Sequence, residues 1–396
     1  MKRRDFIRNS SLASSVLFVP NFLKAFESSQ LKVDGNKKLV ILQLSGGNDG
    51  LNTLVQFNND IYFKNRGTIG QQKNQLLSVS DELGLHESLK DFKTLYDEGL
   101  VSVINDVGYP NPSRSHFRAT DIWQTASSSN EFLKAGWIGR YLDTVSKSQL
   151  GAIEVDDTLS LLMKGEHING IATKDAKLFF KTTQDPYFGA VLNNYKDAHL
   201  SEHNLGYLYK TVIDAKSSAK YIYEKTKLYD SKAEYPQNSF GKQLKTISEF
   251  INSGLETQLY YASLGGFDTH ANQVNSQKRL LEVFSTGIHT FINDLKATGA
   301  LKDTVVLVFS EFGRRLKQNA ANGTDHGAAN LVFLLGDKLK KPGMYNAPAN
   351  LVDLDSNGDI KYKVDFRNIY ASLLKDWLLT QPDAILNGKF ESLNLV

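Results

Sequence analysis

Three short apolar runs, each followed directly by a polar motif, constrain the fold of this chain most strongly. The runs and their motifs are Leu39–Leu44 before SGGNDG, Gln258–Leu264 before GGFDTH, and Thr304–Phe309 before SEFGRR. Short apolar runs bounded by turn residues are typical of buried parallel strands. Ligands of open α/β sheets bind outside the carboxyl ends of the strands. The recurrence of Asp, Glu and His at these ends therefore predicts one shared site.

Segments with helical periodicity alternate with the strand-like runs. Helices are expected at His86–Gly99, Ala119–Lys147, Phe240–Ser253, Gln273–Thr298 and Phe366–Leu379, and further strands at Leu100–Ile104, Gly151–Val155 and Leu331–Leu335. This alternation predicts an α/β fold with a doubly wound, mostly parallel sheet covered on both faces. The polar stretch at about 164–235, which contains an amphipathic segment at Tyr207–Lys227, predicts a helical insertion or cap.

The first 27 residues read as an export signal. Arg3 and Arg4 precede a short, mildly apolar stretch, Ser10–Leu23, which contains Pro20 and is too short to span a membrane. Paired arginines before a weak apolar region resemble a twin-arginine signal. An ordinary secretory signal or a basic tail are the alternatives. We therefore expect a periplasmic or secreted protein without a transmembrane span.

Charge and cysteine content exclude several classes of protein. The leader holds five basic and two acidic residues, a net charge of +3, and the whole chain is also +3. The remainder is thus about neutral and lacks the basic patch of a nucleic-acid-binding protein. The chain has no cysteine, so disulfides, thiolate ligands and a cysteine nucleophile are excluded.

The polar motifs contain candidate ligands for a divalent metal ion, such as Zn²⁺, Mn²⁺, Mg²⁺ or Ca²⁺. Asp49, Asp268 and Glu311 supply carboxylates, and His270 supplies an imidazole two residues after Asp268. Asp325 or His326 in the GTDHG motif could complete the shell. Each motif also has a structural interpretation, since turns, helix caps and ion pairs use the same residue types.

Two further residue types suggest hydrolytic chemistry. Ser113 or Ser115 caps a predicted helix, where a hydroxyl is a usable nucleophile once its pKa is lowered. Either serine is a candidate nucleophile, although such a serine is more often only a cap. Arg314 could hold a phosphate or sulfate oxyanion in bidentate fashion, or form a structural ion pair.

Together, these motifs resemble a family of exported bacterial proteins that is catalogued as a domain of unknown function (number fifteen-oh-one). That family is grouped with the alkaline phosphatase and sulfatase superfamily. The resemblance covers about residues 37–394 and rests on Gln43–Asn52, Gly108–Gln124, Gly266–Gln273, Ser310–Arg314, Gly323–Gly327 and Val364–Trp377.

The resemblance implies an alkaline-phosphatase-like fold and a two-metal hydrolase of phosphate or sulfate esters, with a small molecule or a glycan as the substrate. Carried over by position, the metal ligands would be Asp49, Asp268, His270, Glu311 and His326. From the residues themselves we add Ser115 as the attacking group, with Ser113 as the alternative, either of which requires a rearranged loop, and Arg314 as the residue that steadies the oxyanion.

The chain departs from the superfamily pattern at two places. Glu311 and Phe312 stand where the superfamily has Asp-His, so that one imidazole is lost. Pro110 stands where a sulfatase has the Cys or Ser that becomes formylglycine, which excludes that mechanism. These departures favour an alternative, a non-catalytic envelope protein that keeps the fold and binds glycans or a protein partner. A third hypothesis is that the motifs only brace the edge of the sheet.

Overall fold

A nine-stranded sheet forms the centre of the computed structural model, which describes residues 37–146, 148–186 and 204–396. Its strands are β1 (Lys38–Leu44), β5 (Val101–Gly108), β6 (Ala152–Glu154), β7 (Ile171–Ala172), β8 (Leu259–Leu264), β9 (Thr304–Phe309), β12 (Asn330–Leu335), β13 (Gly343–Met344) and β14 (Val364–Asp365). Their order is β13-β5-β12-β9-β1-β8-β6-β7, with β14 beside β5. Only β12 runs antiparallel to its neighbours, which confirms the mostly parallel sheet.

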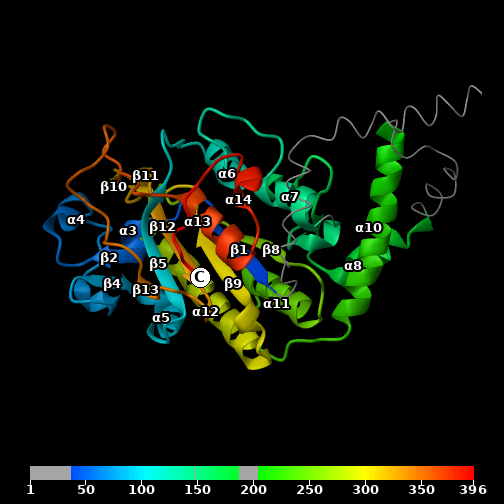
Figure 1. The fold of residues 1–396 in the computed structure, drawn as a ribbon. Helices are drawn as coiled ribbons and strands as arrows, with labels where there is room; N and C mark the ends of the chain where they lie inside the picture. The colour runs from blue at the N-terminus through cyan, green and yellow to red at the C-terminus, as the bar shows by residue number, and fades with distance from the viewer. Residues whose placement is uncertain (1–36, 147, 187–203) are drawn as a thin grey trace, which may run out of the picture. The chain divides into compact units, whose positions relative to one another are not determined.

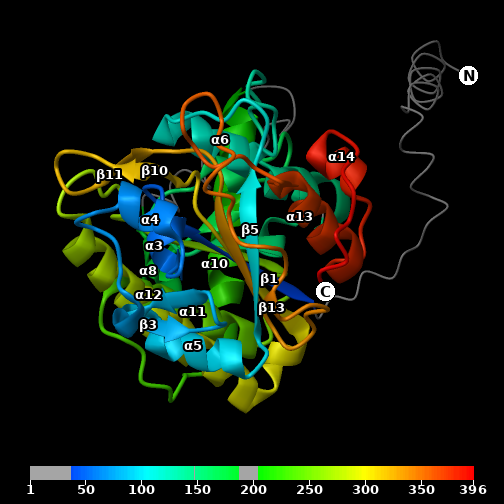
Figure 2. The same cartoon turned by 90° about the vertical axis from the view of Figure 1, so that its left-hand side faces the viewer.

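Helices cover both faces of this sheet. One face packs against α5 (Lys90–Asp97), α11 (Ser239–Asn252) and α12 (Gln273–Thr298), and the other against α6 (His116–Thr125), α7 (Trp137–Tyr141), α13 (Phe366–Ser372) and α14 (Pro382–Leu386). Figure 2 shows α5, α11 and α12 on the opposite side of the strands from α13 and α14. Alternate side chains of β1 enter the two cores, since Val40 and Leu42 join one and Leu39 and Ile41 the other. The doubly wound α/β fold is therefore confirmed.

The structure corrects the predicted boundaries of two helices. The stretch Ala119–Lys147 is not one helix, because α6 ends at Thr125 and the next residue, Ala126, has a φ of 55° in the left-handed region. The chain is irregular from there to α7, and a π-helical turn follows at Leu142–Ser146. The helix predicted from His86 begins at Lys90, because His86 belongs to β4 (Leu83–His86) and a 3₁₀ turn lies between them.

Two small sheets lie outside the central one. β2 (Leu54–Gln56), β4 and β3 (Leu76–Ser78) form a three-stranded antiparallel sheet near α3 (Gly50–Thr53) and α4 (Asp60–Asn65). β10 (Arg314–Gln318) and β11 (Thr324–His326) form a hairpin that the sequence analysis did not predict. Figure 1 shows this hairpin at the same end of the sheet as α6. Arg314 pairs with His326 across the hairpin, which places both residues at the candidate site.

The chain divides into two units, Met1–Asp34 and Gly35–Val396. The predicted leader lies outside the described residues. The segment predicted as an insertion, about 164–235, contains β7, α8 (Ala176–Thr183) and α10 (Asn204–Thr226) and belongs to the second unit. Among the described residues, no helix is both long enough and apolar enough to cross a membrane.

Candidate metal centre

Parallel strands bring the polar motifs to one edge of the sheet. β1 pairs with β8 on one side and with β9 on the other, so that Leu44 lies opposite Leu264 and Gln43 opposite Phe309. The loops after β1 and β8 then touch each other. Gly46 has a φ of 116°, and a Cβ there would lie 2.4 Å from the amide nitrogen of Asp268. Only glycine permits this approach, which sets the position of the Asp268 carboxylate.

Three imidazoles surround that carboxylate. Nε2 of His116 lies 3.3 Å from Oδ2 of Asp268, and Nε2 of both His270 and His326 lies 3.1 Å from Oδ1. The donor atoms of His116, Asp268 and His326 all lie within 4.8 Å of one another. His270 contacts two of these three residues, because its Nε2 is also 2.8 Å from Nε2 of His326. The cluster therefore joins four side chains from three separate segments.

Each imidazole is held from behind by an oxygen atom at Nδ1. His116 meets Oε1 of Glu311 at 3.0 Å, His270 meets Oδ1 of Asp325 at 3.2 Å, and His326 meets the backbone carbonyl of Arg114 at 2.7 Å. Because a carbonyl only accepts, Nδ1 of His326 must donate, and Nε2 of the neutral ring carries a lone pair. Histidines that bind metals are oriented in this way by outer carboxylates and carbonyls.

The residues fit a bound divalent cation. Two ring nitrogens 2.8 Å apart, one of them with a lone pair, are compatible only with a proton or a cation between them or beside them. Nε2 of His116 is buried and has no hydrogen-bond partner, although it faces the Asp268 carboxylate. Three imidazoles and one carboxylate form a donor set that suits Zn²⁺ and similar transition metals.

The charges of the site favour such a cation. The hydrogen bond to Glu311 raises the pKa of His116 more than burial lowers it. Burial lowers the pKa of His326 and so favours the neutral ring. Burial alone would raise the pKa of Asp268, but the hydrogen bond and the charge of Arg314, with the other polar contacts of the site, hold the pKa well below its usual range. At neutral pH the cluster thus holds a carboxylate and an imidazole ready to bind metal.

The cluster is open to solvent on one side. The side chains of Asp268 and His270 are 48% and 44% exposed, while those of His116 and His326 are 32% and 20% exposed. Structural zinc sites are closed by four protein ligands, whereas catalytic sites keep a position for water or substrate. The exposure of these ligands is typical of the second kind.

The structure brings together three of the five predicted ligands, namely Asp268, His270 and His326. Glu311 lies one step further away, buried behind His116, where it also accepts from the backbone N–H of Gly46 at 2.8 Å. Asp49 forms a different group. It is buried in an ion pair with Arg66 and caps α3 through the amides of Leu51 and Asn52.

Arg314 and Ser115 were the predicted catalytic residues. The Arg314 side chain is fully buried and donates to the carbonyls of Gly46, Gly47, Phe267 and Thr324 and to Oδ1 of Asp268 at 2.7 Å. These contacts suit it to hold Asp268 in place. Ser115 is the exposed N-cap residue of α6, directly before His116, and its side chain makes no capping bond.

The sequence-based ligand set lacked His116. A signal was present in the sequence, because this histidine follows Ser115 directly, at the start of the same predicted helix. Phe312, which stands in place of the superfamily's imidazole, packs against both His116 and His326 with ring centroids 4.9 and 4.6 Å away. His116 thus supplies an imidazole beside the position where one is lost.

The fold was compared with solved structures. It matches the lipoteichoic acid synthase LtaP from Listeria monocytogenes at 12% identity and a TM-score of 0.37, covering 78% of this chain and 67% of that one. The C-terminal periplasmic domain of EcEptC from Escherichia coli in complex with Zn matches at 11% identity and a TM-score of 0.37, covering 76% of this chain and 72% of that one. The PsFucS1 sulfatase from Pseudoalteromonas sp. matches at 12% identity and a TM-score of 0.40, covering 94% of this chain and 73% of that one.

Comparison by sequence gives the family. No curated protein matches this chain. The family model described as "Protein of unknown function (DUF1501)" matches residues 36–381, which is most of the chain and includes every residue of the His/Asp cluster. The protein therefore belongs to the DUF1501 family.

Proposed function

We propose that this protein is an exported, metal-dependent hydrolase of phosphate or sulfate esters carried by a small molecule or a glycan. The observation that carries the proposal is the convergence of three imidazole Nε2 atoms on the half-exposed carboxylate of Asp268, each ring being held at Nδ1 by an oxygen atom. Such a site has the ligands and the open side that hydrolytic metal centres need.

The proposed division of labour follows the contacts. His116, Asp268, His270 and His326 would hold the ion, which supplies Lewis acidity and lowers the pKa of a nearby hydroxyl or water. Glu311, Asp325 and the carbonyl of Arg114 orient the three rings. Arg314 fixes the Asp268 carboxylate and ties the loops after β1 and β8 to the hairpin.

The proposed nucleophile is Ser115. Its hydroxyl is exposed, makes no capping bond, and precedes the ligand His116 at the start of α6. The backbone N–H groups of that first turn favour an anionic substrate. Ser115 Oγ would give its proton to solvent and bond to phosphorus or sulfur while the bond to the substrate's alcohol oxygen breaks, and the alcohol would leave with a proton from solvent. Water would then cleave the new ester at Ser115, which releases phosphate or sulfate and restores the hydroxyl.

We assign the contact with the substrate anion to Arg315, because its side chain is the more exposed of the two neighbouring arginines. The guanidinium of Arg314 is fully engaged, whereas the Arg315 side chain is 38% exposed. Nε of Arg315 lies 3.5 Å from Oδ1 of Asp359, whose other oxygen accepts from Arg114, the residue before Ser115.

Metal content tests the proposal first. The mature protein is purified without chelator, beside Asp268→Ala and His270→Ala, with His289→Ala on α12 as the matched histidine control. We expect stoichiometric metal in the parent and in His289→Ala, measured by elemental mass spectrometry, and loss of metal in the other two. A folded parent that binds no added Zn²⁺ or Mn²⁺ would contradict the proposal.

Ester hydrolysis tests the reaction. We expect turnover of p-nitrophenyl phosphate or p-nitrophenyl sulfate that is lost on chelation and in Ser115→Ala, while Ser113→Ala keeps it. Metal binding without turnover of either ester would instead favour the non-catalytic envelope protein. That alternative is favoured by Phe312, which stands in place of an imidazole, and by Pro110, which stands at the superfamily's nucleophile position.

A further inference from the structure

Arg114 links the metal centre to a hairpin turn far along the chain. Its backbone carbonyl accepts the Nδ1 proton of His326 at 2.7 Å. Its side chain points to a different partner, because Nε and Nη2 both donate to Oδ2 of Asp359, the first at 2.9 Å. The same residue therefore orients a ligand with its main chain and is itself held by its side chain.

Asp359 is suited to hold Arg114 in one position. Its side chain is fully buried, whereas that of Arg114 is 29% exposed. The other oxygen, Oδ1, lies 3.5 Å from Nε of Arg315 without forming a hydrogen bond. A buried carboxylate between two guanidiniums has a strong electrostatic reason to keep both in place, since its charge would otherwise be uncompensated.

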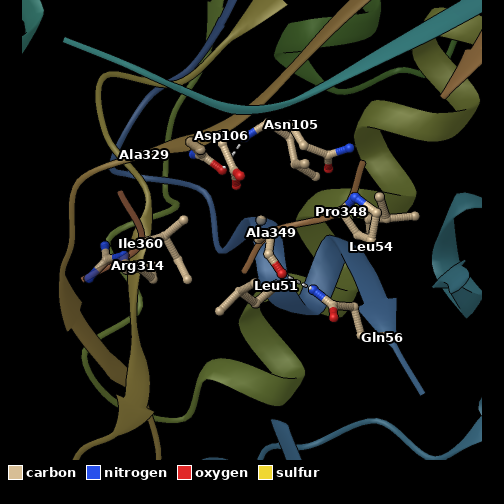
Figure 3. A pocket seen from close by; sticks show the side chains of 13 residues that line it. Leu51, Leu54, Gln56, Asn105, Asp106, Arg314, Ala329, Pro348, Ala349 and Ile360 are labelled. Atoms are coloured by element: carbon tan, nitrogen blue, oxygen red, sulfur yellow. Dashed lines mark hydrogen bonds between the residues drawn. The ribbon is translucent and has the colours of Figure 1, made fainter. Parts of the chain in front are cut away.

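The turn that carries Asp359 is itself firmly anchored. Leu354 and Ile360 pair as an antiparallel bridge, and Gly358 makes the turn with a φ of 80°. Ile360 is 4% exposed and lines a cavity together with Arg314 and Leu51 (Figure 3). Its carbonyl accepts from the amide of Ala329 at 3.4 Å, three residues after His326. The turn thus contacts two segments that carry proposed ligands, at Arg114 before His116 and at Ala329 after His326.

We propose that Asp359 is a positioning residue for the metal centre, acting through Arg114 to fix the ring and tautomer of His326. The inference rests on the proposed metal site and deepens it. Loss of the Asp359 charge would free the Arg114 side chain, and its carbonyl would then no longer stay aligned with Nδ1 of His326. Because that hydrogen bond favours the tautomer in which Nε2 carries the lone pair, its loss would lower metal affinity.

The test compares Asp359→Asn with Asp355→Asn in the full mature protein. Asp355→Asn removes a carboxylate charge beside the same arginine, but Asp355 lies 3.6 Å from Nη2 of Arg114 and its side chain is 25% exposed. Zn²⁺ affinity is measured by chelator competition. We expect a loss of about 10- to 100-fold for Asp359→Asn, and at most about fivefold for Asp355→Asn, as for a partly exposed ion pair.

A spectroscopic readout separates positioning from general stability. Nitrogen-15 NMR of the metal-free protein gives the tautomer of His326, which should change in Asp359→Asn and not in Asp355→Asn. Should Asp359→Asn fail to fold, Arg114→Lys keeps the charge and loses the two-donor grip, and the same tautomer change is expected. Unaltered affinity and tautomer in the folded variants would overturn the inference while the proposed function stands. If the parent binds no metal but the tautomer of His326 differs between the parent and Asp359→Asn, the link from Asp359 to His326 would stand while the proposed function fails.

Discussion

Asp49 and Asp268 follow neighbouring parallel strands, lie at the same edge of the sheet, and look alike in sequence. Their surroundings differ. Asp49 is buried, with Oδ1 accepting from the amides of Leu51 and Asn52 and Oδ2 from Arg66 and Gln273. Asp268 is 48% exposed, and the Nε2 atoms of three imidazoles converge on it. Donors saturate the first carboxylate, whereas the second faces a surplus of lone pairs that a cation would satisfy.

The difference separates a structural polar group from a ligand-binding one. Burial without partners would cost the Asp49 group several kcal/mol, so the chain supplies a complete set of donors around it. The Asp268 cluster leaves Nε2 of His116 without a hydrogen bond and places two other Nε2 atoms 2.8 Å apart. An incomplete set that converges on one point is the stronger indication of a bound ligand.

The largest expected effect is on stability, at Asp49. Asp49→Ala leaves the buried Arg66 charge unpaired, and we expect a loss of about 3–5 kcal/mol in the free energy of unfolding, measured by urea denaturation. Metal bound per folded molecule should stay unchanged. If this variant instead lost its metal and kept its stability, Asp49 would be the ligand that the sequence suggested. The contrast between a structural Asp49 and a metal-binding Asp268 would then be wrong.

Asp268→Ala should show the opposite pattern. Removal of a ligand should cost at least about 100-fold in metal affinity, since loss of an outer partner alone costs about 10- to 100-fold. The unfolding free energy of the metal-free protein should change by no more than about 1 kcal/mol, because the carboxylate is half exposed. Chelator competition and urea denaturation of the same samples check both values. A large loss of stability with metal retained would favour the hypothesis that this motif only braces the sheet edge.

The third prediction concerns pH. The hydrogen bond to Glu311 raises the pKa of His116, so the metal-free protein keeps this proton to a higher pH than an ordinary histidine does. Metal must displace the proton, so we expect affinity to fall as the pH is lowered, by up to about tenfold per pH unit. The stability of the metal-free protein should change in the opposite direction with pH. A pKa of His116 that is higher in the folded than in the unfolded state stabilises the fold at a pH below the unfolded-state pKa, and this stabilisation is lost as the pH rises through the folded-state pKa.

Glu311→Gln sharpens the pH test. It removes the charge that raises the pKa of His116, and the amide oxygen can still accept from Nδ1. The fall in affinity should then begin at lower pH than in the parent, in competition titrations between about pH 5.5 and 8.5. An affinity that does not depend on pH in either protein would show that His116 is not a ligand.

Much of the fold was predictable from local patterns. Gln273–Thr298 and Thr304–Phe309 have the boundaries predicted, because amphipathic periodicity and a continuous apolar run are both strong local signals. The β10–β11 hairpin was missed because Arg314–Gln318 is polar and its strand pairing depends on a partner segment. The break after α6 was missed because Ala126 adopts its left-handed conformation without a glycine to signal it.

The candidate site was predictable in part. Strand ends identified Asp268 and His270, and the motif before β12 offered Asp325 or His326 as alternatives. The structure places His326 in the cluster and Asp325 behind His270. His116 was missed because its role depends on Glu311, which is 195 positions away in the chain. Such long-range pairing leaves no local pattern, and the same holds for Asp49 and Arg66.

The smallest expected effect is at Asp325, which tests whether the outer partners of the cluster contribute to affinity. Its carboxylate meets Nδ1 of His270 but is 53% exposed, so solvent weakens the contact. We expect Asp325→Asn to lower metal affinity about three- to tenfold, below the usual range for an outer partner. Asp353→Asn, an exposed carboxylate paired with Lys361, is the matched control and should leave the affinity unchanged. A loss of affinity as large as that of Asp268→Ala would show that Asp325 binds the metal directly and is not only an outer partner of His270.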